Sequence, residues 1–318
     1  MKTMKAALIH SFEGSENVTI EEVATPIPKE HEVQIAVKYA GVNPVDWKIT
    51  DGLLQTRMKH QFPIILGWDV SGEISQVGKE ITHLKVGDPV FAYCRKEIIH
   101  DGSYAEYICL AADNVIIKPK NITFAQAASV PLSALTAWQS LFDTAHLNSK
   151  EEILIHAGAG GVGGFAIQFA KLVGAHVITT TSAANFDYVK KFGADEIIDY
   201  VKENFVDAIH KKHPNGVDVV YDTVGGNTLQ ASYLAAKEGG RLITIAGVVD
   251  RTLTASHHLT ADLYFVHPDG KELTKIASLL EEKKILPPHI QEMPFDSVVL
   301  ALRKIREGHT QGKIVLKI

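Results

Sequence analysis

The segment His156–Gly163 constrains the fold of this chain more than any other. It carries three glycines in a G-x-G-x-x-G pattern. The apolar, branched run Ile153–Ile155 precedes it, as expected of a buried parallel strand, and Phe165–Ala170 follows as a helix with few polar positions. Strand, glycine turn and helix predict a Rossmann-type, doubly wound parallel sheet, in which backbone N–H groups at the turn approach a dinucleotide pyrophosphate.

The strand that follows lacks the acidic residue of an NAD-specific site. His176–Thr179 is the expected second strand, and it continues into the uncharged loop Thr180–Asn185. An Asp or Glu about 20 residues after the glycines would bind the ribose 2′-OH and repel a 2′-phosphate. The sequence therefore favours NADPH over NADH, with a plain solvated connector as the alternative interpretation of this loop.

Composition restricts the possible partners. The chain has 318 residues, a formal net charge of −5 and a hydrophobic fraction of 46%, which is ordinary for a globular protein with room for two domains. No basic run indicates a nucleic-acid partner, and no apolar run approaches the length of a membrane span. Lys5–Ile9 is typical of a strand and not of a signal-peptide core.

The two cysteines, Cys94 and Cys109, are too few for a zinc lobe or a disulfide framework. We expect both to be small hydrophobic core residues in a reducing, cytoplasmic environment.

The pattern of elements changes twice along the chain. Residues 1–124 contain short strands separated by turns, which predict a mainly β domain. Residues 125–267 alternate between helical and strand patterns, including a helix at Val201–Lys211 and a strand at Arg241–Ala246, and predict a parallel sheet with helices on both faces. Residues 268–318 are predicted to complete the first domain.

Several motifs resemble those of the medium-chain dehydrogenase/reductase superfamily, and within it the zinc-free quinone oxidoreductase branch. The resemblance covers nearly the whole chain and implies a GroES-like catalytic domain built from both termini, a central Rossmann domain and an active site in the cleft between them. The matching segments are Ala40–Trp47, Gly67–Gly72, Val86–Val90, Gly102–Tyr107, Leu135–Trp138, the glycine turn and His309–Leu316.

The zinc ligands of the superfamily's alcohol dehydrogenases are absent. Asn43 stands at the matching Cys position and Trp68 at the matching His position, and neither side chain is a competent zinc ligand. The histidines show no ordinary ligand spacing beside a carboxylate, so the sequence predicts no metal site. Without a Lewis acid to polarise an alcohol oxygen, alcohol oxidation is disfavoured.

The resemblance implies hydride transfer from NADPH to a small electrophile. A quinone is the leading acceptor, the double bond of an enone or 2-alkenal is the alternative, and a cofactor-binding sensor or structural protein with little turnover is an alternative of another class. Asn43 is predicted to donate to and orient the acceptor. Asp46 matches an acidic position of the family, where it would either relay a proton or buttress the loop, while Trp47 and Tyr104 are better explained as core residues.

The resemblance also implies the cofactor contacts. The glycine turn should face the pyrophosphate, Ser182 and Tyr200 the 2′-phosphate, and Asn185 departs from the Lys that the family often has there. The implied residues are Thr136, Gly158, Gly160, Gly161, Val162, Gly163, Ser182, Asn185, Tyr200, Val224, Ala246, Gly247, Phe265, Val266 and Lys313.

A homodimer is the last expectation. Arg241–Ala246 is predicted to lie near the far edge of the sheet, followed by the β-prone Thr252–Thr254. An exposed edge strand favours pairing with a symmetry mate.

Overall fold

The computed structural model describes residues 2–318, which form two compact units. The β-rich unit contains the chain up to Leu132 together with His267–Ile318, and the α/β unit is Ser133–Val266. The first boundary lies later than residue 125 because two contacts tie the intervening segment to the β-rich unit. Ser71 Oγ donates to the carbonyl of Phe124 over 2.6 Å, and the Leu132 N–H donates to Asp69 Oδ1 over 2.7 Å.

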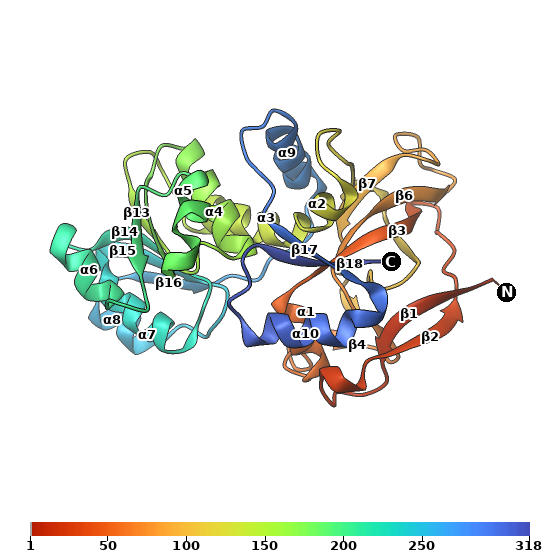
Figure 1. Cartoon of the computed structure of the whole chain (residues 1–318), viewed down its shortest axis with the longest axis horizontal. Helices are drawn as coiled ribbons and strands as arrows, with labels where there is room; N and C mark the ends of the chain where they lie inside the picture. The colour runs from red at the N-terminus through yellow and green to blue at the C-terminus, as the bar shows by residue number, and fades with distance from the viewer. Residues whose placement is uncertain (1) are drawn as a thin grey trace. The chain divides into compact units, whose positions relative to one another are not determined.

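A seven-stranded sheet organises the β-rich unit. Its strands run in the order β10-β7-β6-β3-β18-β17, with β9 also pairing with β3. Figure 1 shows the C-terminal strand β18 beside β3, with which it pairs antiparallel, so both ends of the chain build this unit. The strands are β3 (Glu32–Val42), β6 (Asp69–Val77), β7 (Pro89–Tyr93), β9 (Tyr107–Ala111), β10 (Val115–Ile117), β17 (Ile290–Pro294) and β18 (Lys313–Lys317).

The rest of the β-rich unit consists of smaller sheets and short helices. The sheet β2-β1-β5 comprises Thr19–Ala24, Thr3–Ile9 and Ile64–Ile65, and β4 (Lys59–His60) pairs with β8 (Ile98–Ile99). Cys94 and Cys109 are buried free thiols, as predicted, and Cys94 packs in the main core. The helices are η1 (Ser15–Asn17), α1 (Pro44–Thr50), η2 (Ala112–Asn114), α2 (Phe124–Ala128), α9 (Gly270–Glu281), η5 (Phe295–Ser297) and α10 (Val298–Glu307).

Six parallel strands form the centre of the α/β unit and confirm the predicted Rossmann architecture. Their order, β13-β12-β11-β14-β15-β16, is that of a doubly wound sheet whose strand order reverses beside β11. The strands are β11 (Glu152–Ile155), β12 (His176–Thr181), β13 (Glu196–Asp199), β14 (Val217–Asp222), β15 (Ala236–Thr244) and β16 (Thr260–Leu263).

Helices connect these strands. Helix α6 begins later than Val201 because Asn204 caps it, its side chain accepting from the N–H groups of Val206 and Asp207. The helices are α3 (Pro131–Trp138), which starts in the β-rich unit, η3 (Gln139–Thr144, a π-helix), α4 (Gly161–Leu172), η4 (Ala183–Asn185), α5 (Phe186–Lys191), α6 (Phe205–Lys212), α7 (Gly226–Ala235) and α8 (Arg251–Ser256).

The β-prone segment Thr252–Thr254 is helical. Thr252–Thr254 lies in α8, which forms because the Asp250 side chain accepts from the N–H groups of Thr252 and Leu253 at its start. Strand β15 lies near the far edge of the sheet, as predicted, and β16 is the strand that ends it. Among residues 2–318, no helix combines the length and apolar character needed to cross a membrane.

Candidate nucleotide-binding and active site

The carboxyl ends of the six parallel strands collect most of the predicted cofactor residues. Parallel strands end at the same edge of a sheet, and ligands bind there in open α/β folds. The glycine turn follows β11, Ser182 and Asn185 follow β12, Tyr200 follows β13, Val224 follows β14, Ala246 and Gly247 follow β15, and Phe265 and Val266 follow β16.

Contacts within the protein explain why two of the three motif positions must be glycine. A Cβ on Gly158 would lie 2.1 Å from Thr179 Oγ1, and a Cβ on Gly163 would lie 2.3 Å from the carbonyl oxygen of Ala157. A Cβ on Gly160 would meet only that carbonyl, at 3.3 Å, and the backbone of Gly160 is extended with φ −78°. A Cβ at 3.3 Å is tight and would require a small shift of the Ala157 carbonyl, a much smaller demand than at Gly158 or Gly163. The absence of a side chain at Gly160 leaves the backbone open to a ligand.

Helix α4 supplies an anion site directly after this glycine. Its N-cap is Gly160, no side chain caps it, and its first turn contains no acidic residue. The first N–H groups of a helix have no acceptor within the helix, and the helix dipole favours negative charge there. Gly161, Val162 and Gly163 provide these N–H groups, and their contact with a pyrophosphate stays a prediction.

His156 supports the turn, a role that the sequence did not indicate. Its ring is buried, with Nδ1 3.1 Å from Thr180 Oγ1 and Nε2 3.1 Å from Ser232 Oγ. Because the Ser232 hydroxyl donates to the carbonyl of Thr228, it accepts from His156, whose proton therefore lies on Nε2. Burial lowers the pKa of His156 to about 4, so the ring stays neutral and ties the turn to β12 and α7.

Asp222 fixes the neighbouring strand ends. Its buried carboxylate accepts from the N–H groups of Val224 and Gly225 and from the Thr244 hydroxyl, the last over 2.6 Å. These bonds join the turn after β14 to the end of β15 and position Val224 and Ala246 at the same edge.

The loop after β12 contains no carboxylate, as the sequence shows. Ser182 is partly exposed, and its Oγ accepts a hydrogen bond from Asn185 Nδ2 over 3.3 Å. Tyr200, which follows the next strand, is 47% exposed. Hydroxyl and amide groups at this point suit a 2′-phosphate.

Replacing Gly160 with alanine is expected to weaken NADPH binding at least about tenfold while lowering the melting temperature less than Gly163→Ala does. The added methyl needs only a small shift of the Ala157 carbonyl but separates the turn from a pyrophosphate. Gly163→Ala is the matched comparison, because its Cβ would clash with backbone and should lower the melting temperature. Fluorescence titration with NADPH and thermal unfolding measure both effects. Unchanged affinity in Gly160→Ala would show that no ligand approaches this glycine.

A second cluster lies inside the β-rich unit, around the two predicted catalytic residues. Asn43 precedes α1, and its backbone N–H donates to Asp46 Oδ2 over 2.8 Å. The hydroxyl of Tyr104 donates to the same oxygen over 2.7 Å. Asn43, Asp46 and Tyr104 are buried, so the structure favours a buttressing role for Asp46 and a core position for Tyr104.

The amide of Asn43 is also engaged within this unit. Its Nδ2 donates to Asp69 Oδ2 over 2.9 Å, and its Oδ1 accepts from Lys313 Nζ. The geometry therefore supports Asn43 as an organiser of its loop, while the predicted donation to an acceptor stays a prediction.

Lys313 takes part in this cluster. Its buried ammonium donates to the carbonyl of Val42 over 3.0 Å and to Asn43, and it lies 3.4 Å from Asp69 Oδ2. These contacts lie among residues of the β-rich unit, so the implied cofactor contact of Lys313 stays a prediction. The pairing of Asp69 with Lys313 was not foreseen, although Asp69 belongs to the quoted Gly67–Gly72 motif.

Burial sets the electrostatics of the cluster. Burial raises the pKa of Asp46 to about 7, and the bonds from Asn43 and Tyr104 only partly oppose it. Asp46 Oδ1 is buried without a hydrogen-bond partner. Burial likewise lowers the pKa of Lys313 and raises that of Asp69, with each charge opposing the shift of the other.

Of the other residues named from the sequence, Trp68 and Thr136 are buried, whereas Trp47 is only partly buried. Trp68, at the superfamily's His position, is buried with its ring edge-on to Tyr93 at a centroid distance of 6.1 Å. Thr136 is buried on α3. Trp47 lies under the guanidinium of Arg306, 5.1 Å from the ring centroid.

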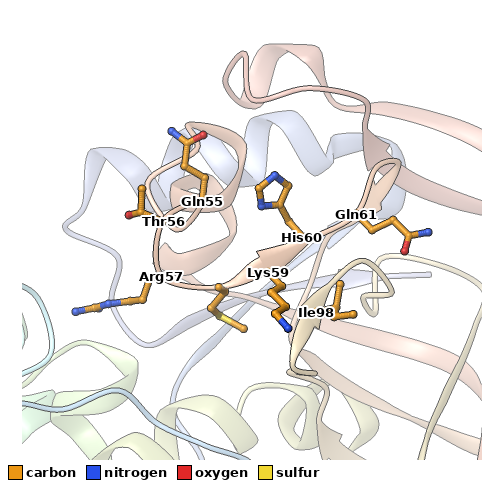
Figure 2. Close-up of a pocket in the computed structure, with 8 residues that line it drawn as sticks. Gln55, Thr56, Arg57, Lys59, His60, Gln61 and Ile98 are labelled. Carbon is orange, nitrogen blue, oxygen red and sulfur yellow. The ribbon is translucent and has the colours of Figure 1, made fainter.

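One surface hollow of the β-rich unit lies apart from these residues. It has a volume of about 540 Å³ and is lined by residues 55–61 and Ile98. Figure 2 shows the cationic side chains of Arg57 and Lys59 among those that line it. It contains none of the predicted site residues.

Comparison with known proteins identifies the family. Residues 29–120 match the family described as alcohol dehydrogenase GroES-like domain, and residues 192–316 match the family described as zinc-binding dehydrogenase. The chain belongs to the medium-chain dehydrogenase/reductase superfamily, in its zinc-free quinone oxidoreductase branch, which confirms the resemblance seen in the sequence.

Individual relatives cover nearly the whole chain. A spinach chloroplast quinone-oxidoreductase homolog is 31% identical over 99% of this chain and 100% of its own. An Arabidopsis thaliana chloroplast NADPH-dependent alkenal/one oxidoreductase is 33% identical over 99% of this chain and 80% of its own. The structure of the quinone oxidoreductase from Coxiella burnetii superposes with a TM-score of 0.89 at 32% identity and covers all of both chains.

Proposed function

We propose that this protein is an NADPH-dependent reductase that transfers hydride to a quinone. The observation that carries the proposal is the glycine turn, open at Gly160, at the edge where six parallel strands end. Family membership and the quinone oxidoreductase relatives support the reaction class.

The residues at this edge fit NADPH. The N–H groups of Gly161, Val162 and Gly163 would hold the pyrophosphate, and Ser182 and Tyr200 the 2′-phosphate. The alkenal/one oxidoreductase relative is NADPH-dependent by name, which supports the same cofactor. When bound, NADPH supplies the hydride.

The residues at the superfamily's zinc-ligand positions favour an acceptor that is already electrophilic. Asn43 and Trp68 replace the Cys and His ligands, so no Lewis acid is expected to polarise an alcohol oxygen. A quinone needs no such activation. An enone or 2-alkenal shares this property, and the alkenal/one oxidoreductase relative favours it as the second candidate function.

A comparison of turnover with quinones and with enones or 2-alkenals tests the proposal. NADPH oxidation is followed at fixed enzyme concentration with a series of quinones and with enones and 2-alkenals, all in the presence of a chelator. We expect reduction of quinones and a primary isotope effect with deuterated NADPH in single turnover. Faster reduction of enones would select the second candidate. Tight NADPH binding without turnover of either series would overturn a reductase function in favour of a cofactor-binding protein.

Ser182→Asp should shift cofactor preference toward NADH, with NADPH affinity falling at least about tenfold. The new carboxylate repels a 2′-phosphate and can bind a free ribose 2′-OH. Titrating wild type and variant with both cofactors measures the shift, and Ser149→Asp, in the loop before β11, is the control for added surface charge. Equal loss of affinity for NADH and NADPH would argue against a 2′-phosphate contact at Ser182.

A homodimer through the end of the parallel sheet is part of the proposal. Strand β16 ends the sheet and has partly exposed residues, so an edge is available there for pairing with a second copy. Light scattering at micromolar concentration should give twice the chain mass of 34.8 kDa, and a monomer mass would contradict the proposal. Cytoplasmic localisation, inferred from the two free cysteines, stays a prediction.

A further inference from the structure

Two histidines and a glutamate meet at the edge of the parallel sheet opposite the glycine turn. His176 is the first residue of β12, Glu196 is the first residue of β13, and His213 follows the C-terminus of α6. Parallel strands begin at one edge and end at the other, so this group is separate from the cofactor residues. The positions lie on three elements, which is why their spacing in the sequence gave no signal.

The three side chains converge on one point. Glu196 Oε1 lies 3.0 Å from His176 Nε2 and 3.2 Å from His213 Nε2. All three ligand atoms lie within 4.8 Å of one another. Tetrahedral zinc with bonds of about 2.0–2.1 Å places neighbouring ligand atoms about 3.3 Å apart, so small side-chain movements suffice to enclose an ion.

Further carboxylates face the outer nitrogens of both rings. His213 Nδ1 lies 3.0 Å from Glu152 Oε2, and His176 Nδ1 lies 3.7 Å from Asp195 Oδ2. Histidine ligands of metal ions commonly donate their second N–H to a carboxylate in this way.

The ring of His213 faces more hydrogen-bond acceptors than a neutral imidazole has N–H groups. Both of its ring nitrogens face carboxylate oxygens, which only accept hydrogen bonds when ionised, whereas a neutral imidazole has one N–H. The second nitrogen therefore needs either an additional proton or a metal ion.

The local charges favour a cation. Lys212 Nζ binds Oε2 of Glu196 over 2.8 Å and leaves Oε1 directed at the two rings. Lys171 binds Asp195 over 2.7 Å. With neutral imidazoles, the carboxylates of Glu152, Asp195 and Glu196 exceed these two ammonium groups by one charge.

We propose that His176, Glu196 and His213 bind a divalent transition-metal ion, zinc in the first instance, through Nε2, Oε1 and Nε2. The site ties the starts of β12 and β13 to the end of α6 and stabilises the α/β unit from the side away from the cofactor. An ion can enter from solvent because the His176 and Glu196 side chains are 40% and 21% exposed.

Zinc titration of the full chain tests this site. Protein treated with a chelator and dialysed is titrated with zinc chloride by calorimetry, and bound metal is counted by elemental analysis. We expect one zinc per chain, a higher melting temperature with zinc, and tetrahedral absorption bands when cobalt(II) replaces it. Glu152→Gln should weaken binding about tenfold through the outer N–H of His213.

Glu196→Gln and His176→Asn are the decisive variants, since Glu196→Gln keeps the side-chain volume and both introduce an amide that can still form hydrogen bonds. Each should lower zinc affinity about a hundredfold while far-UV circular dichroism stays that of wild type. His10→Ala is the control, because His10 makes the same contact with Glu21 at 3.0 Å on the surface of the β-rich unit. Zinc binding that is unchanged in both variants, or absent from the wild type, would overturn the site.

Discussion

Lys313→Met is expected to lower the free energy of unfolding by about 3–5 kcal/mol at pH 7, because it leaves the buried carboxylate of Asp69 without its counter-charge. The variant also removes a donor to Asn43 and to the carbonyl of Val42. The loop that precedes α1 should therefore loosen as well.

Urea unfolding followed by tryptophan fluorescence measures this loss. Trp47 and Trp68 both lie in the β-rich unit and report on it. Lys317→Met is the matched control, since Lys317 is on the same strand but exposed. The double variant Lys313→Met/Asp69→Asn should recover part of the loss. A loss below about 1 kcal/mol in Lys313→Met would mean that Asp69 is already neutral in the folded protein.

Asp46→Asn should stabilise the protein at high pH relative to wild type, by up to about 4 kcal/mol more at pH 8 than at pH 4. Burial raises the pKa of Asp46 from 3.8 to about 7. The folded chain thus binds this proton more tightly than the unfolded chain, so the contribution of Asp46 to stability falls as pH rises from about 4 to about 7. Asparagine keeps an acceptor for Asn43 and Tyr104 and removes the ionisation.

Denaturation curves of variant and wild type between pH 4 and pH 8 give the difference directly. Asp113→Asn, at an exposed position in η2, controls for loss of a surface charge. A difference that stays constant over this range would show that Asp46 is ionised throughout. A turnover rate that also falls in Asp46→Asn, at unchanged stability, would indicate the proton relay instead of the buttress.

The glycine turn illustrates what sequence could predict about the site. Its chemistry is local, since a strand, three glycines and a helix within about 20 residues determine where backbone N–H groups lie. The parallel sheet then places every following strand end at the same edge. Ser182, Tyr200, Val224 and Gly247 could therefore be assigned to one region by counting strands.

Capping and edge assignments were harder to predict. Thr252–Thr254 has β-prone residues, yet the Asp250 side chain starts a helix there, because a capping carboxylate outweighs a weak intrinsic preference. The strand after it, β16, then covers β15 and becomes the end of the sheet.

The sequence by itself determined the nucleotide-binding architecture, the absence of a carboxylate after β12 and the loss of the superfamily's zinc ligands at Asn43 and Trp68, because each depends on residue types within short segments. Only the tertiary structure decided that Lys313 neutralises Asp69 and that His176, Glu196 and His213 meet. Lys313 and Asp69 are 244 positions apart in the sequence. The other three residues belong to three different parts of the α/β unit, at β12, at β13 and at the end of α6. Charged residues that are far apart in the sequence are brought together by the packing of whole sheets, and no local sequence pattern encodes that packing.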